Sequence, residues 1–204
     1  MKSGLIIFIR NPVKGKVKTR LAKTMGDEKA FLIYNQLLLH THLITRDLSY
    51  DKFLYYSDHI DPADMWNNNQ YQKRLQTRGD LGERMSTAFR DLFLEGYERL
   101  LIIGSDCMEL KESIICKAFD MLNVHRVIIG PSEDGGYYLL GMTTPLPGIF
   151  VNKKWGTPSV FADTVQDLLN TGIMEGRLET LKDIDEEKDI PGTLLQLISH
   201  QRPT

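Results

Sequence analysis

The first chemistry-bearing feature of the sequence is a cluster of basic residues near its beginning. The segment 5–23 holds six lysine and arginine side chains and no carboxylate, in a chain whose net charge is only -2. It opens with an apolar run, residues 5–9, which Pro12 ends because proline cannot donate to a β-ladder. Backbone N–H groups and mobile cations that converge beyond a buried strand bind polyphosphates well. The pattern therefore predicts an anion-binding loop, with the basic residues Arg10, Lys14, Lys16, Lys18, Arg20 and Lys23.

The alternative for such a run is a solvated, purely structural surface. The crowding of the cations directly after the first apolar run favours the binding loop. Two well-known phosphate loops are excluded by residue type. Gly15 and Lys16 are followed by Val17 rather than by Ser or Thr, and no G-x-G-x-x-G follows the run.

Asp106 is the second candidate, because it lies just beyond the apolar run 99–103. In open α/β sheets, ligands collect beyond the carboxyl ends of the strands, and hard cations prefer carboxylate oxygens. Asp106 is therefore predicted to bind Mg²⁺ or Mn²⁺. The alternative is that Asp106 caps the helix expected to begin near Lys111.

Two glycine pairs complete the candidate site. Gly79 and Gly82 enclose Asp80 and Leu81 ahead of a helical pattern, which indicates either close backbone approach to a ligand or a simple turn capped by Asp80. Gly135 and Gly136 follow Asp134 between two strand-like runs, where Asp134 is expected to bond a substrate hydroxyl or only to stabilise a turn. The irregular segment 143–158, which contains Trp155, is expected to lie over the site.

The pattern of elements around these residues predicts an α/β fold in a single domain, residues 1–204. Apolar runs predict strands and 3.6-residue periodicity predicts helices. The expected strands are 5–9, 52–57, 99–103, 127–130, 137–142 and 178–181. The expected helices are 27–46, 85–93, 111–122, 161–169 and 191–198.

Composition narrows the class of protein. With 42% hydrophobic and 25% charged residues, the chain is an ordinary globular sequence. No apolar stretch could span a bilayer and the opening residues do not resemble a signal peptide, so no membrane association and a cytoplasmic location are expected. The balanced charge argues against nucleic acid as a partner. Cys107 and Cys116 form no metal or disulfide motif and are expected to be buried thiols.

Six segments in order resemble the bacterial DUF2064 family, which belongs to the GT-A, or nucleotide-diphospho-sugar transferase, superfamily. The segments are PVKGKVKTRLA, GDLGERM, GSDCMEL, PSEDGGYYLLG, WGT and DIDEEKD. The likeness spans nearly the whole chain. It implies a Rossmann-like α/β/α sandwich with a mixed sheet that binds a nucleotide and a divalent cation.

The resemblance also implies roles for single residues. The loop with Lys14, Gly15, Lys18 and Arg20 is similar to the triphosphate loop of sugar nucleotidyltransferases and of phospholactate guanylyltransferases. The segment 79–84 resembles the region beside the nucleobase, and Asp106 matches the principal metal ligand. Asp185 looks like the second metal ligand, with Asp183 as its substitute, because Glu186 and Glu187 replace the usual Thr-Pro. Met108 also stands where proline is common.

Three hypotheses follow. The leading one is Mg²⁺-dependent transfer of a nucleotidyl group from an NTP to a small phosphorylated acceptor, with Lys18, Arg20 and Asp106 as the catalytic residues. Transfer of a sugar from a nucleotide sugar is the second, although its usual Asp-x-Asp motif is reduced here to Asp106 alone. The third is a nucleotide-binding module without turnover. The nucleobase, the acceptor and the oligomeric state are left open.

Overall fold

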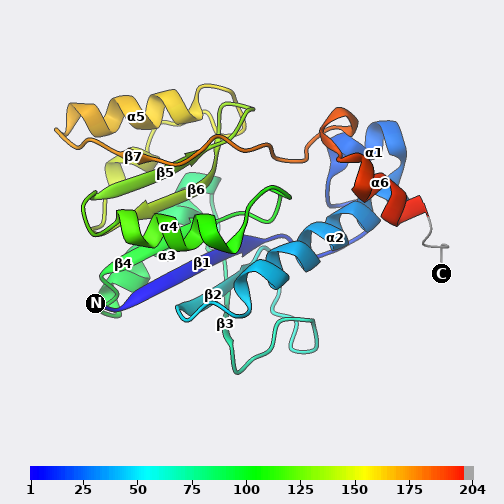
Figure 1. Cartoon of the computed structure of the whole chain (residues 1–204), viewed down its shortest axis with the longest axis horizontal. Helices are drawn as coiled ribbons and strands as arrows, with labels where there is room; N and C mark the ends of the chain where they lie inside the picture. The colour runs from blue at the N-terminus through cyan, green and yellow to red at the C-terminus, as the bar shows by residue number, and fades with distance from the viewer. Residues whose placement is uncertain (200–204) are drawn as a thin grey trace.

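The computed structural model of the chain describes residues 1–199, except for the side chain of Ser199, and shows one mixed sheet flanked by helices (Figure 1). Residues 200–204, which include His200 and the end of the predicted domain, lie outside the described part. The sheet has seven strands in the order β3-β2-β1-β4-β6-β5-β7. They are β1 (Ser3–Ile9), β2 (Asp51–Tyr56), β3 (Tyr71–Leu75), β4 (Arg99–Ile103), β5 (Val127–Pro131), β6 (Tyr137–Met142) and β7 (Gly176–Arg177).

Helices connect these strands. They are α1 (Thr19–Met25), α2 (Asp27–Thr45), α3 (Leu81–Leu94), α4 (Glu112–Met121), α5 (Val160–Asn170) and α6 (Gly192–Ser199), with two 3-10 turns, η1 (Pro147–Phe150) and η2 (Glu187–Asp189). Among the described residues, no helix is long and apolar enough to cross a membrane.

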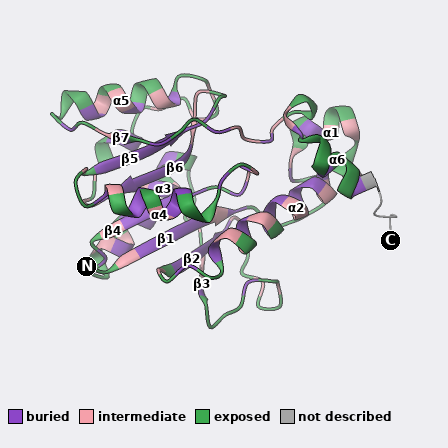
Figure 2. Cartoon of the chain, viewed as in Figure 1, coloured by how far each residue is buried: buried purple, intermediate pink, exposed green. Residues whose placement is uncertain are grey.

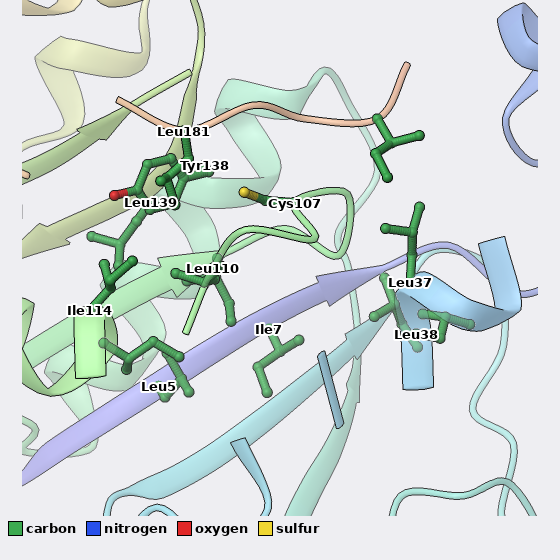
Figure 3. Close-up of a cluster of buried hydrophobic side chains, with 14 of the residues drawn as sticks. Leu5, Ile7, Leu37, Leu38, Cys107, Leu110, Ile114, Tyr138, Leu139 and Leu181 are labelled. Atoms are coloured by element: carbon green, nitrogen blue, oxygen red, sulfur yellow. The ribbon is translucent and has the colours of Figure 1, made fainter. Parts of the chain in front are cut away.

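The strand β1 lies inside the sheet, between β2 and β4, and both of its faces are apolar. Leu5 and Ile7 belong to one core cluster and Ile6 to another, so successive side chains alternate between two cores. Helices α2 and α4 pack on the first core and helix α3 with η1 on the second. Figure 2 shows the buried strands between the partly exposed helices, and Figure 3 shows Leu37, Leu38 and Ile114 in the first core. The predicted α/β/α sandwich with a mixed sheet is confirmed.

Several local predictions need correction. Strand β3 was not predicted, because its sequence YQKRL is mostly polar, and an edge strand can keep polar side chains in solvent. The predicted strand 178–181 is displaced: β7 ends at Arg177, and only Leu181 forms a further bridge, to Ser132. The basic segment is not wholly a loop, because helix α1 begins at Thr19. Cys107 is buried as expected, whereas Cys116 is half-buried.

Candidate functional site

Nearly all of the candidate residues lie in segments that follow the carboxyl ends of the parallel strands, which form one edge of the sheet. Strands β1, β2, β3 and β4 are parallel, and β5 runs in their direction because it is antiparallel to β6, which is antiparallel to β4. Parallel strands end at a common edge, where α/β folds bind their ligands. The segments that follow β1, β3, β4, β5 and β7 therefore converge there, and they contain every residue that the sequence singled out except Trp155.

Lys18 is the centre of a charged cluster at this edge. Its ammonium lies 2.8 Å from Oδ1 of Asp106 and 3.4 Å from Oδ1 of Asp185, and it donates a hydrogen bond of 2.7 Å to the carbonyl of Ile184. The side chain of Lys18 is only 6% exposed, whereas those of Asp106 and Asp185 are 46% and 36% exposed. The backbone joins the same segments, because the Ile184 amide donates to the Asp106 carbonyl over 2.9 Å. We call Lys18, Asp106, Asp183 and Asp185 the lysine–aspartate cluster.

The backbone of Lys18 has an unusual conformation. Lys18 has a φ of 48° in the left-handed region and precedes the first turn of α1. A residue other than glycine costs free energy in this region, and such positions concentrate at functional sites. Asp106 does not act as a helix cap, since α4 begins at Glu112 after Lys111. The alternative structural role for Asp106 is therefore wrong.

Electrostatics in the cluster favour a bound cation. Burial lowers the pKa of Lys18, but the attraction of Asp106 and Asp185 outweighs burial, so the net pKa of Lys18 is raised and its ammonium stays charged. Burial and the negative charges of Asp106 and Asp134 raise the pKa of Asp183 to about 7, although Lys18 opposes this shift. The acidic groups thus outnumber the positive charge between them.

The other basic residues of the loop take different positions. Arg20 lies 3.6 Å from Asp185 through its guanidinium and is 63% exposed. Lys14 instead pairs with Glu28 on α2, and its side chain is 56% exposed. Gly15 has a φ of 79° and forms the turn between them. The structure therefore brings Lys18 and Arg20 to the aspartates but leaves Lys14 apart from them.

The segment 79–82 has a clear structural role. Asp80 accepts a hydrogen bond from the Glu83 amide, and Glu83 accepts one from the Asp80 amide, so the two form a capping box at the start of α3. Gly82 is buried, and a Cβ there would meet the Phe150 carbonyl and the Trp155 ring at 2.6 Å. Leu81 is exposed. The close approach to the backbone at Gly82 is therefore made by the Trp155 ring and the Phe150 carbonyl.

The turn 134–136 is also stabilised locally. Asp134 accepts hydrogen bonds from the Ser132 hydroxyl and, over 2.9 Å, from the Gly136 amide. Gly135 has a φ of 87°, and a Cβ there would meet the Pro158 carbonyl at 2.2 Å. The turn therefore packs against the segment that carries Trp155, and the Asp134 charge is close enough to act on Asp183.

Sequence reasoning missed a cavity of about 410 Å³ beside the ends of β1 and β2. Asn11, which is only 4% exposed, holds this region together: its carboxamide accepts from the Asp58 amide and donates to the His59 carbonyl. The sequence carries no specific signal for this role of Asn11, because its burial is visible only in the structure. The cavity is lined by Arg10, Asn11, Val13, Lys16, Ser57, Asp58, His59 and Arg84.

A second cavity, of about 560 Å³, lies between α1 and η2, and its lining includes Arg20, Lys23 and Lys188. It adjoins the lysine–aspartate cluster through Arg20, which contacts Asp185. Both cavities therefore border the basic segment, one at its beginning and one at its end.

The donor set suits a magnesium-type cation that arrives with a ligand. Among residues 1–199 no group of three or more His, Cys, Asp or Glu side chains is arranged to enclose a metal ion. Mg²⁺, however, usually binds through one or two carboxylates together with phosphate oxygens and water. Asp106 and Asp185 already hold one cation, the Lys18 ammonium, between them. The pair therefore fits the implied cation.

Comparison with solved structures defines the class of fold as that of the nucleotide-diphospho-sugar transferases. A Desulfovibrio desulfuricans protein provisionally described as such a transferase has a TM-score of 0.85 and 27% identity, covering 98% of this chain and 96% of that one. The inositol-1-phosphate CTP transferase from T. maritima has a TM-score of 0.51 and 14% identity, covering 98% and 95%. The 4-diphosphocytidyl-2C-methyl-D-erythritol synthase from Anaerococcus prevotii has a TM-score of 0.57 and 9% identity, covering 97% and 96%.

The chain belongs to the family described as "Uncharacterized protein conserved in bacteria (DUF2064)", whose model matches residues 41–157. The resemblance predicted from the motifs is therefore confirmed. The matched range contains Asp106 and both glycine pairs, while Lys18 and Asp185 lie outside it. No curated protein matches the chain.

Proposed function

We propose that the protein is a transferase that moves a nucleotidyl group from an NTP to a small phosphorylated acceptor, with Mg²⁺ or Mn²⁺ as the cofactor. The observation that carries this proposal is the contact of 2.8 Å between the Lys18 ammonium and Asp106. It joins the basic loop after β1 to the aspartate after β4 at the ligand-binding edge of a transferase-type fold.

The charges of the cluster divide into two roles. Lys18 and Arg20 bind the phosphates of the nucleotide, because ammonium and guanidinium groups form strong charge-assisted hydrogen bonds to phosphate oxygens. Asp106 and Asp185 hold the divalent cation, with Asp183 beside them. When bound, this cation neutralises charge on the phosphates and so favours displacement.

The reaction needs little help from an acid or a base. A phosphate oxygen of the acceptor is already anionic; it bonds to the α-phosphorus of the NTP, and the bond from that phosphorus to the pyrophosphate breaks. Positioning and charge neutralisation supply most of the catalysis in such displacements. Two of the histidines fit this expectation, since His40 contacts the Leu110 carbonyl and His42 packs against Trp66. His59, in contrast, lines the cavity beside Asn11.

The nucleoside is best accommodated in the cavity beside Asn11. This cavity includes Arg84 from the segment 79–84, which was predicted to lie near the nucleobase, and Lys16 from the phosphate loop. The acceptor would lie toward Asp134, Gly135 and Gly136, which pack against the segment that carries Trp155. Trp155 also lies against Gly82, at the start of the helix that carries Arg84.

Transfer of a sugar from a nucleotide sugar is the second candidate. The observation in its favour is the likeness to the Desulfovibrio protein described as a nucleotide-diphospho-sugar transferase. Glu133 and Asp134 are exposed and could serve as the base toward an acceptor hydroxyl. Against it stands the single aspartate of the segment after β4.

A thermal-shift panel of the four common NTPs and several nucleotide sugars, each with and without Mg²⁺, tests the proposal. Stabilisation by one or more triphosphates in the presence of Mg²⁺ is expected, because a ligand that binds only the folded state raises its melting temperature. Stabilisation by nucleotide sugars alone would select sugar transfer. No stabilisation by any compound would reject both forms of the transferase.

A further inference from the structure

The Lys18 ammonium is coordinated as a small hard cation would be. It has three contacts, all with oxygen atoms: the Ile184 carbonyl at 2.7 Å, the Asp106 carboxylate at 2.8 Å and the Asp185 carboxylate at 3.4 Å. Carbonyl and carboxylate oxygens are also the ligands that Mg²⁺ and Ca²⁺ prefer. The position between the two aspartates is therefore already taken by a positive charge that belongs to the chain.

This arrangement leaves Lys18 without a free donor. An ammonium has three N–H groups, and three oxygen atoms surround this one. With its side chain only 6% exposed, Lys18 can bind a phosphate only by giving up at least one of these contacts. The contact with Asp185 is the longest and is the first expected to break.

We propose that Lys18 is an internal counter-ion that occupies the divalent-cation position until a polyphosphate draws it away. In the ligand-free protein the ammonium competes with a divalent cation for Asp106 and Asp185. Once phosphates bind Lys18, the two carboxylates are released to the cation. This inference rests on the proposed function for the identity of the polyphosphate, but the competition itself involves only residues of this chain.

This competition couples the binding of the cation to the binding of the nucleotide. A free cation binds weakly, since it must displace a tethered charge, and a nucleotide and a cation favour each other because each relieves the contact that hinders the other. Coupling of this kind is reciprocal. Lys18 would thereby keep the site from holding a metal ion in the absence of substrate.

Mn²⁺ binding in the absence of any nucleotide tests the inference directly. Free Mn²⁺ is measured by electron paramagnetic resonance during titration of wild type, Lys18→Met and Lys23→Met. Methionine keeps a long flexible stem and removes the charge, and Lys23 is an exposed lysine on α1 that serves as the matched control. Lys18→Met should bind one Mn²⁺ at least about tenfold more tightly than wild type, which corresponds to about one favourable contact, and Lys23→Met should match wild type.

Arg20→Met distinguishes direct competition between Lys18 and Mn²⁺ from a general effect of removing a nearby positive charge. Arg20 is 63% exposed and 3.6 Å from Asp185, so its removal should tighten Mn²⁺ binding by less than about threefold. Equal Mn²⁺ affinity in wild type and Lys18→Met, or an equal gain in Lys18→Met and Arg20→Met, would overturn the inference.

Lys18→Gln is studied in parallel, with circular dichroism to confirm that each variant is folded. If neither variant at Lys18 folds, acetic anhydride labelling of wild type decides. Lys18 should become more reactive as Mn²⁺ is raised, with Lys23 unchanged, and a constant reactivity of Lys18 would refute the competition. None of these measurements includes a nucleotide, so a failure of the proposed transferase would instead appear as absent nucleotide binding in the thermal-shift panel.

Discussion

Two sets of aspartates at the same edge of the sheet differ in the partners that they bind. Asp80 and Asp134 accept hydrogen bonds from residues two or three positions away in the sequence. Asp106 and Asp185 contact Lys18, which is far from both of them in the sequence and is nearly buried. The first two carboxylates stabilise a helix end and a turn, whereas the other two are held together only by the tertiary fold.

This difference shows how the sequence should be read. An aspartate beside glycine has a ready local use, as a cap or in a turn, and that use needs no ligand. A lysine that is buried between aspartates from distant segments has no such local explanation. Removing one partner of a buried ion pair is costly, and perturbed charges of this kind concentrate at functional sites.

The largest expected difference between the two sets appears when one aspartate of each set is neutralised. Asp106→Asn should weaken Mg²⁺-dependent NTP binding by about 100-fold, the equivalent of roughly 2.7 kcal/mol, because a charge-assisted contact to the cation is lost. Asp134→Asn keeps the oxygen that accepts from Gly136 and should change NTP affinity by less than about threefold. Isothermal titration calorimetry measures both.

The apo melting temperature of Asp106→Asn provides the control for folding. Lys18 keeps Asp185 as its ionic partner, the amide oxygen can still accept a hydrogen bond from Lys18, and one charge that repels Asp183 is removed, so the temperature should change little. Equal losses of NTP affinity in Asp106→Asn and Asp134→Asn would erase the distinction between the two sets.

Gly82→Ala tests whether Gly82 is needed for close packing of the start of α3 against Phe150 and Trp155. A Cβ would come within 2.6 Å of the Phe150 carbonyl and the Trp155 ring, so overpacking should lower the free energy of unfolding by about 1–3 kcal/mol in urea titrations. Gly148→Ala, where no atom lies within 4 Å of the added Cβ, should change it by less than about 0.5 kcal/mol. Similar changes in the free energy of unfolding for the two variants would contradict this packing role.

Arg20→Ala sharpens the contrast within the basic loop. Arg20 lies beside Asp185 and is 63% exposed, so its loss should weaken NTP binding by about tenfold, roughly 1.5 kcal/mol, without lowering stability. Lys14→Ala should have a smaller effect because Lys14 pairs with Glu28 rather than with the cluster. A larger loss of affinity in Lys14→Ala than in Arg20→Ala would move the phosphate site away from the aspartates.

Asp183 gives the cluster a pH dependence. Its pKa is raised from 3.8 to about 7, so between these values the folded state binds more protons than the unfolded state. Stability should therefore fall as pH rises through this window, with a slope of at most about 1.4 kcal/mol per pH unit from this group. In urea titrations between about pH 4 and pH 8, Asp183→Asn should reduce the fall; an unchanged profile would contradict the shift.

Much of the fold was predictable because its central strands are apolar on both faces. Strands β4 and β6 begin and end where the pattern placed them, and β1 is close to its predicted bounds. Strand β3 could not be predicted because it is a polar edge strand, whose assignment depends on pairing with β2 rather than on its own pattern. Helix α1 could not be predicted because a segment of seven residues, TRLAKTM, is too short to show a clear periodicity.

The candidate site was predictable only as a set of segments. Residue types and the strand-end rule placed Lys18, Arg20 and Asp106 at one edge, which the structure brings together. The carbonyl of Ile184 and the buried Asn11 could not be identified, since a backbone oxygen carries no sequence signal and a lone asparagine has many uses. The sequence left Asp183 and Asp185 as alternatives, and both lie in the cluster.

A crystal of the protein grown with Mn²⁺ and an NTP analogue that resists cleavage tests the central claim most directly. We expect an anomalous scattering peak shared by Asp106 and Asp185, with the Lys18 ammonium on a phosphate oxygen. A bound nucleotide with its manganese away from both aspartates, or with Lys18 and Asp106 still paired as in the free protein, would contradict it.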